Sequence, residues 1–124
     1  MQIRVTTIVL DAADLFAESA FWSQLLGGTV HAEDGWHTIR VDGSPRIAIQ
    51  GVPDHTPPDW PDGSPQQIHL DLDVDDIRAA HPQAVALGAQ VLSPAAGPDL
   101  DASVGFQVYA DPAGHPFCLC WGQP

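Results

Sequence analysis

The order of predicted elements occurs twice along the chain, and this repeat limits the possible folds more than any other feature. Each half contains a strand, a helix and three further strands. Asp14 and Asp76, which begin the two helices, are 62 positions apart, and the Leu-Gly pairs that end them are 61 apart. Each half alone has too few elements to cover its own sheet. The repeat therefore predicts an α+β fold, in which two βαβββ modules form curled mixed sheets around a cavity with the helices outside.

Alternating hydrophobicity, β-branched residues and turn residues set the expected boundaries. In the first module the expected strands are Ile3–Leu10, Thr29–Glu33, Trp36–Val41 and Arg46–Gly51. In the second module they are Gln67–Val74, Ala89–Ser93, Val104–Ala110 and Pro116–Trp121. The second helix is expected to run from Asp75-Asp76 to about Leu87, with a kink or a break near Pro82. We expect one domain over 1–124, with module one at 3–51, a proline-rich crossover loop at 52–65 and module two at 66–121.

The charge balance excludes several classes of partner. The chain has 16 acidic residues against four arginines and no lysine, and its formal net charge is -12. A nucleic-acid binder needs a basic surface, and an anionic membrane would repel this chain. Cationic ligands would be attracted instead. No apolar run approaches the roughly 20 residues of a membrane span, and the N-terminus has no signal-peptide pattern. We therefore expect a cytoplasmic protein.

The segment Gln67–Val74 alternates strictly between apolar and polar residues. On a strand, its apolar side chains share one face and His69 lies on the other. We expect a helix to cover the apolar face, so that His69 faces the space between the modules. Asp71 and Asp73 share the face of His69, but they lie roughly 7 and 13 Å along the strand and are expected toward the cavity rim. Cys118 and Cys120 flank one residue and are expected as buried free thiols.

Four local motifs, in this order, carry a resemblance to a known family. They are Asp14 followed by Phe21-Trp22 and Leu26-Gly27, then Ile68-His69-Leu70 followed by Asp75-Asp76, then Ala86-Leu87-Gly88, and finally Asp111-Pro112-Ala113-Gly114 before the last strand. Together they resemble the vicinal oxygen chelate (VOC) superfamily, in its glyoxalase-like and bleomycin-resistance-like branch. The resemblance covers about Ile3 to Trp121.

The resemblance implies where a metal would bind. Metal-dependent members hold the ion with four side chains, typically two His or Gln and two Glu, from the first and last strand of each half. Carried over by position, these are Thr7, Gln50, His69 and Cys118. Only His69 keeps a typical ligand type, whereas a divalent cation prefers imidazole and carboxylate ligands. We therefore predict no complete metal site and keep His69 and Cys118 as candidate ligands for a divalent metal.

Other side chains are candidates for ligand contact or for local structure. Trp60, in the proline-rich segment, is a candidate lid over the cavity, with simple anchoring of its loop as the alternative. Trp36 and Phe106 are candidate wall residues. Asp111 is expected to cap the turn before the last strand, with His115 inside that turn. The remaining histidines have no partner at metal-ligand spacing.

Three functions remain open from the sequence. The first is a binding protein that holds an aromatic or cationic small molecule without the complete metal site of the family. The second is a VOC-family lyase, isomerase or dioxygenase that uses His69 as a metal ligand or a general acid–base. The third is a subunit that only packs against a partner, since single-module relatives often form two-fold dimers. We expect a homodimer, and the catalytic residues stay unassigned.

Overall fold

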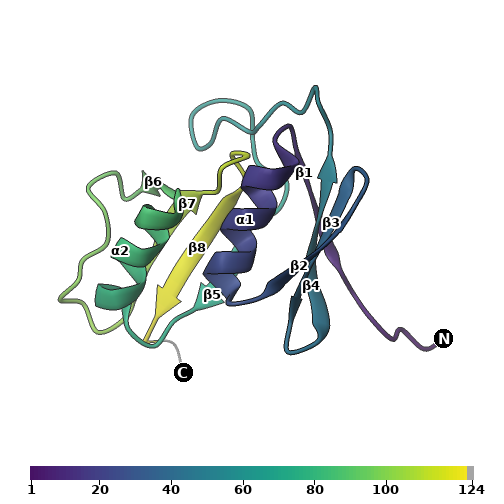
Figure 1. Cartoon of the computed structure of the whole chain (residues 1–124). Helices are drawn as coiled ribbons and strands as arrows, with labels where there is room; N and C mark the ends of the chain where they lie inside the picture. Colours follow the sequence, from purple (N-terminus) through teal and green to yellow (C-terminus); the bar gives the residue numbers. More distant parts are fainter. Residues whose placement is uncertain (123–124) are drawn as a thin grey trace. The chain divides into compact units, whose positions relative to one another are not determined.

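The computed structural model describes residues 1–122 and divides the chain into two compact units. The first unit ends at Thr56 and the second begins at Pro57. This boundary lies inside the proline-rich segment, where consecutive prolines disfavour both helix and paired strand. Each unit contains one helix and one four-stranded sheet (Figure 1).

The first unit is a βαβββ module. Its elements are β1 (Ile8–Ala12), α1 (Leu15–Leu26), β2 (Thr29–Glu33), β3 (Trp36–Val41) and β4 (Ser44–Gly51). The strands lie in the order β1-β4-β3-β2, with β1 parallel to β4 and the other pairs antiparallel. Helix α1 packs against β2, β3 and β4. The Asp14 carboxylate accepts a hydrogen bond from the Ala17 amide at 3.0 Å, which confirms the predicted N-cap.

The second unit has the same topology. Its elements are β5 (Leu70–Asp73), α2 (Ile77–Leu87), β6 (Gln90–Ser93), β7 (Gly105–Ala110) and β8 (Pro116–Trp121). The order is β5-β8-β7-β6, again with one parallel pair, β5 with β8, and two antiparallel pairs. Helix α2 packs against β8 (Figure 1). The predicted fold class of two βαβββ modules with mixed sheets is therefore confirmed.

Two first strands are shorter than predicted, and the reason is the same in both units. Strand β1 begins at Ile8 rather than Ile3, and β5 covers Leu70–Asp73 rather than Gln67–Val74. Each pairs in parallel with the last strand of its module, over five residues for β1 and four for β5. Ile3 is 73% exposed. A β-branched run becomes a strand only where a partner accepts its backbone hydrogen bonds.

Helix α2 continues through Pro82, where the sequence predicted a kink or a break. Proline lacks the amide that would donate to the carbonyl four residues earlier. Both ends of the helix are nevertheless well defined. The Asp76 carboxylate accepts from the Arg78 amide at 2.9 Å, and Gly88 has a φ of 117°, which favours glycine. Neither helix of the described residues combines the length and the apolar character that a membrane span requires.

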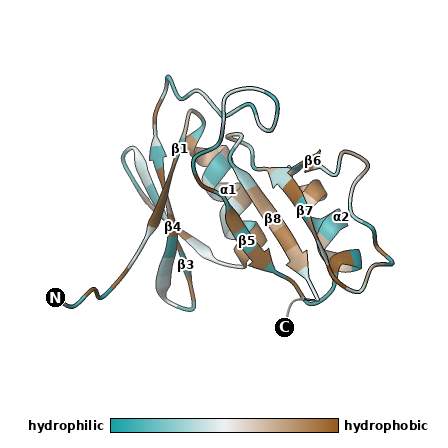
Figure 2. Cartoon of the chain, turned by 180° about the vertical axis from the view of Figure 1, so that it is seen from behind, coloured by the Kyte–Doolittle hydropathy of each residue, from teal (hydrophilic) through white to brown (hydrophobic). Residues whose placement is uncertain are grey.

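The second sheet presents two different faces. Tyr109 and Phe117 are register partners, are fully buried and stack at a centroid distance of 5.3 Å. The Tyr109 hydroxyl lies 2.8 Å from Nδ1 of His81 on α2, so this is the face that the helix covers. Leu70 pairs with Phe117 and belongs to the same face. Strand β8 is hydrophobic along most of its length (Figure 2), and all six of its residues are buried. The predicted helix-covered face is therefore confirmed at Leu70, whereas Ile68, which precedes β5, is 60% exposed.

Candidate functional site

A cavity of about 460 Å³ lies on the face of the second sheet opposite α2. Side chains alternate along a strand, so residues next to Phe117 and Leu119 point away from the helix. The cavity is lined by one imidazole, two carboxylates, one aromatic ring and two thiols. These belong to His69, Asp71, Asp73, Phe106, Cys118 and Cys120. The imidazole predicted to face away from the helix does so.

Strand register arranges most of these residues in two rows across the sheet. Asp71 on β5 pairs with Cys118 on β8, which pairs with Val108 on β7. We call this the Asp71 row.

The next row lies one pleat further along the sheet. Asp73 pairs with Cys120, which pairs with Phe106. We call this the Asp73 row. Paired strands are about 4.8 Å apart, so each row places a carboxylate beside a thiol, with an apolar side chain on the far strand.

His69 extends the Asp71 row into a cluster of three potential ligands. Its Nε2 lies 3.3 Å from Oδ1 of Asp71, and its Nδ1 lies 3.5 Å from Nε2 of Gln66. One ligand atom from each of His69, Asp71 and Cys118 lies within 4.8 Å of the other two. The expectation that Asp71 lies well away from His69 is wrong, because the two side chains meet at 3.3 Å, whereas its place toward the cavity rim stays a prediction. The strand rise separates backbones, whereas the two side chains lean toward each other.

The two thiols lie in an environment that disfavours their ionisation. Burial raises the pKa of Cys118 to about 12, and the charge of Asp71 and a hydrogen bond to it add to the rise. Burial also raises the pKa of Cys120, followed by the charges of Asp71 and Asp73. Both thiols are therefore protonated at neutral pH when no cation is close. A cation placed among them would reverse this effect, because it favours the thiolate.

The donor set of the cluster fits a zinc-type ion. Zn²⁺ binds imidazole nitrogen, carboxylate oxygen and thiolate sulfur in tetrahedral sites. Sites with three protein ligands leave the fourth position open for water or substrate. His69, Asp71 and Cys118 supply these three donor types from β5, β8 and the residue just before β5. The thiol makes the set softer than an all-oxygen site, which favours Zn²⁺ over Mg²⁺ or Ca²⁺.

The four ligand positions carried over from the resemblance divide between the units. Thr7 precedes β1 and is half-buried, and Gln50 on β4 is exposed and pairs with Asp11 and Trp36. His69 and Cys118 lie in the second unit, within the cluster. The convergence of Thr7 and Gln50 with this cluster stays a prediction.

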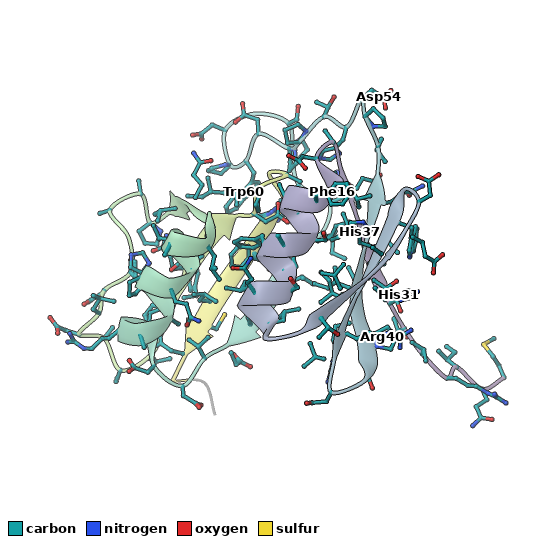
Figure 3. All side chains as sticks on the ribbon, viewed as in Figure 1. Phe16, His31, His37, Arg40, Asp54 and Trp60 are labelled. Carbon is teal, nitrogen blue, oxygen red and sulfur yellow. The ribbon has the colours of Figure 1, made fainter. Side chains whose placement is uncertain are left out.

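The candidate aromatic residues also have distinct positions. Trp60 (labelled in Figure 3) is half-buried and packs against Val108, Cys118 and Cys120, the buried apolar floor of the cavity face. Phe106 lines the cavity and is 59% exposed. Trp36 begins β3 in the first unit, and its indole donates to the Thr38 hydroxyl at 3.3 Å. Their roles as lid or wall residues stay predictions.

Two further histidines have structural partners. His37 is 3% exposed, and its Nδ1 lies 2.8 Å from the Ser19 hydroxyl. The Phe16 ring meets the His37 ring edge-on at 4.9 Å (Figure 3). His31 lies 3.3 Å from Glu33 on the same exposed strand. Both contacts lie within the first unit.

Asp111 caps its turn as predicted. Its Oδ1 accepts hydrogen bonds from the Ala113 amide at 3.0 Å and the His115 amide at 2.8 Å. The Asp111 amide in turn donates to the His115 carbonyl at 2.9 Å. Asp111 is 3% exposed and its carboxylate accepts from its own turn, so its role is structural.

Three cavity residues were not among the predicted site residues, namely Asp71, Asp73 and Cys120. A signal for all three was present in the strand periodicity, because Asp71 and Asp73 alternate with His69 and Cys120 alternates with Cys118. The missing information was the register between β5 and β8, which places Asp71 beside Cys118. A parallel register cannot be obtained from the spacing of either strand alone.

Comparisons with known proteins agree with this architecture. The sequence model of the glyoxalase-like domain matches residues 7–120. A comparison with curated protein sequences finds no significant match.

Several solved structures share the fold. The fosfomycin resistance protein FosX from Listeria monocytogenes (hexagonal form) is 16% identical, with a TM-score of 0.71 over 99% of this chain and 96% of that chain. A second structure of that protein, complexed with Mn(II) and a sulfate ion, is 16% identical, with a TM-score of 0.68 over 99% of this chain and 93% of that chain. A glyoxalase/bleomycin resistance protein/dioxygenase family enzyme from Burkholderia phytofirmans PsJN is 18% identical, with a TM-score of 0.71 over 94% and 97%.

Proposed function

Because the chain belongs to the glyoxalase-like domain family of the VOC superfamily, we propose that it is an enzyme acting on a small molecule in the cavity of the second unit. A divalent cation, with Zn²⁺ as the best fit, is held there by His69, Asp71 and Cys118. This is the enzymatic reading of the sequence, with one change in the ligand set. The two positions where family members carry glutamate have no carboxylate in this chain, and Asp71 supplies one instead.

One observation carries the proposal. The nitrogen, oxygen and sulfur ligand atoms of three side chains lie within 4.8 Å of one another in the wall of an open cavity. His69 and Asp71 are exposed, and Cys118 is buried. These three residues would hold an ion in the cavity wall, where a small molecule in the cavity could reach it. Catalytic metal sites keep such an open position, whereas structural sites are closed.

The residues of the cavity then have separate roles. A bound Zn²⁺ supplies a Lewis acid for a substrate oxygen, or lowers the pKa of a water molecule. Before an ion binds, Asp71 orients the His69 imidazole through the 3.3 Å contact at Nε2. Asp73 lies in the same cavity outside the ligand cluster, so its carboxylate remains available to a bound molecule. Phe106 lines one side of the cavity and offers its ring to a bound molecule.

The comparisons support an enzyme more than a passive binder. FosX is described as a fosfomycin resistance protein, and one of its structures contains Mn(II). The Burkholderia relative is described as a family enzyme. With 16% and 18% identity these neighbours share the fold, and their substrates are not carried over.

A second candidate function is metal-free binding of a cationic or aromatic molecule. It is favoured by the 59% exposed ring of Phe106, which shares the cavity with the carboxylate of Asp73. The two candidates differ in what the cluster does. In the second, the His69–Asp71 contact is part of the wall, and the thiol of Cys118 stays protonated.

Cobalt substitution separates the two candidates. The untagged full chain is freed of metal, titrated with Co²⁺, and followed by absorption spectroscopy. A thiolate ligand gives an intense near-ultraviolet charge-transfer band, so we expect this band at one equivalent of Co²⁺. Cys118→Ser should abolish it, whereas Cys120→Ser, a matched change outside the cluster, should retain it. His69→Ala and Asp71→Asn should each weaken Co²⁺ and Zn²⁺ binding by at least about tenfold.

The same titration can overturn the proposal. If the Co²⁺ complex shows no thiolate band, or if Cys118→Ser binds Zn²⁺ as tightly as the unchanged chain, the cluster is not a metal site. His31→Ala provides the histidine control, because His31 lies in the first unit beside Glu33. Circular dichroism of each variant shows whether a loss of binding reflects a loss of fold.

A further inference from the structure

We infer that the cavity of the second unit selects substrates that carry a positively charged organic group, bound between Asp73 and Phe106. The inference rests on the proposed function, because it assigns a substrate class to the same cavity. It concerns the Asp73 row, whereas the proposed metal site concerns the Asp71 row. The two can therefore be tested separately.

The geometry of the Asp73 row provides a slot for such a group. Asp73 and Phe106 pair with Cys120 from opposite sides, so they lie two strands apart. Two strand spacings amount to about 10 Å between backbones, a span that fits one ammonium or guanidinium group between the two side chains. The ring of Phe106 is 59% exposed and lines the cavity. A carboxylate on one side and an aromatic face on the other form a common arrangement for binding an organic cation.

The charges of the cavity point the same way. If Asp71 and the Cys118 thiolate bind a dication, the three charges cancel. Asp73 then remains as a negative charge of the cavity wall that no ligand neutralises. A cationic group of the substrate compensates it, whereas an anionic group would be repelled.

The basic residues of the second unit offer no binding site for an anionic substrate group in the cavity. From Pro57 onward the sequence contains one arginine, Arg78, and no lysine. Arg78 lies on α2, which covers the other face of the sheet, and its guanidinium forms an ion pair with Asp101. Among the described residues that line the cavity, a phosphonate or carboxylate substrate would therefore find no arginine or lysine, and the metal would be its main positive partner. The cavity is suited to a cation that presents an oxygen to the metal.

Choline is a suitable probe, because its hydroxyl oxygen and its quaternary ammonium match the two rows. The Zn²⁺-loaded full chain is titrated with choline, with its neutral carbon isostere dimethylbutanol and with propylphosphonate, and binding is followed by amide NMR shifts. We expect choline to bind at least about tenfold more tightly than dimethylbutanol. Propylphosphonate should bind more weakly than choline. The largest shifts are expected for residues of β5, β7 and β8.

Variants of the Asp73 row provide the decisive comparison. Asp73→Asn and Phe106→Ala should each remove most of the preference for choline over dimethylbutanol, and Phe106→Tyr should retain it. Asp75→Asn is the matched control, because it changes the net charge equally but lies outside the cavity lining. Zn²⁺ affinity, measured on the same samples, should change little in all four variants.

The outcomes separate the inference from the proposed function. If Zn²⁺ binds through the cluster but choline binds no better than dimethylbutanol, the inference is wrong and the metal site stands. The inference is equally wrong if Asp75→Asn weakens choline binding as much as Asp73→Asn does, because long-range charge would then explain the preference. If choline is preferred in the absence of any metal binding, the proposed enzyme is wrong and the cation slot stands.

Discussion

Asp71 and Cys118 are register partners on the parallel strands β5 and β8, and burial, reinforced by the Asp71 carboxylate, raises the pKa of the thiol and keeps it protonated. The Asp71 carboxylate forms a hydrogen bond with the protonated thiol, and its negative charge would repel a thiolate. This description applies to the protein when no cation is bound. The same pair would become two anionic ligands once a cation lies between them, so the register of two strands sets up the chemistry of the cavity.

Removing the charge of Asp71 should make Cys118 more reactive. Burial is the largest cause of the raised pKa of Cys118, and Asp71 contributes through its charge and a hydrogen bond. In metal-free Asp71→Asn, the pKa should therefore fall but stay above the ordinary thiol value. The pH profile of alkylation by iodoacetamide, followed by mass spectrometry of the Cys118 peptide in a Cys120→Ser background, measures the change. An unchanged profile would show that Asp71 does not act on this thiol.

The stability of the fold should decrease at alkaline pH. The pKa values of Cys118 and Tyr109 are raised to about 12 from ordinary values of 9.0 and 10.0, mainly by burial. In the unfolded chain both groups lose their protons earlier. The contribution is therefore fully present below about pH 9 and is lost as the pH rises toward 12. Urea unfolding across this range should show a falling midpoint.

Two variants identify the groups responsible for this alkaline loss. Cys118→Ser and Tyr109→Phe should each flatten the decline of the midpoint between about pH 9 and pH 12, whatever they cost at neutral pH. The slope, rather than the absolute stability, is the relevant quantity. Tyr109→Phe also removes the 2.8 Å contact with His81, which lowers stability without a pH dependence in this range. Equal slopes in all three proteins would contradict the assignment.

The turn before β8 should depend on the carboxylate of Asp111. Its Oδ1 accepts from two amides and the residue is 3% exposed, so Asp111→Ala removes the acceptor of two partly buried hydrogen bonds. We expect a loss of about 1 to 3 kcal/mol in the free energy of unfolding. Asp111→Asn, which keeps one side-chain carbonyl as an acceptor, should lose less. If Asp111 acted on substrate, both variants would instead lose function while keeping their urea midpoints.

Local signals explain which parts of the fold were predictable. Asp14, Asp76 and the glycines after the two helices act within a few residues of themselves, so their roles followed from the sequence. The alternation around His69 also fixed which face of β5 the helix covers. The true starts of β1 and β5 depend on distant partners, β4 and β8. No local pattern contains that information.

The candidate site was predictable only in part, for a related reason. His69 and Cys118 were found through the resemblance, position by position. Asp71 was placed at the rim, because strand rise alone separates it from His69. The side chains in fact meet at 3.3 Å, and Cys118 lies across from Asp71 on the next strand. A cluster of this kind is a property of register and of side-chain direction together.

The packing of Trp121 on Gly105 provides the last prediction. The two residues are register partners, and a Cβ on Gly105 would lie 2.5 Å from the Trp121 ring. The ring cannot move away freely, because it is 5% exposed and its indole donates to the Ala102 carbonyl at 3.0 Å. Gly105→Ala should therefore cost about 1 to 3 kcal/mol.

Gly51→Ala is the matched control for this packing. Gly51 also lies in a strand, and its Cβ would meet no atom closer than 3.6 Å, so the substitution should be close to neutral. Urea unfolding of the two variants checks the difference, and near-ultraviolet circular dichroism reports on the Trp121 environment. If Gly105→Ala unfolds at the same urea concentration as Gly51→Ala, the indole is free to shift, and the contact does not hold β7 and β8 in register.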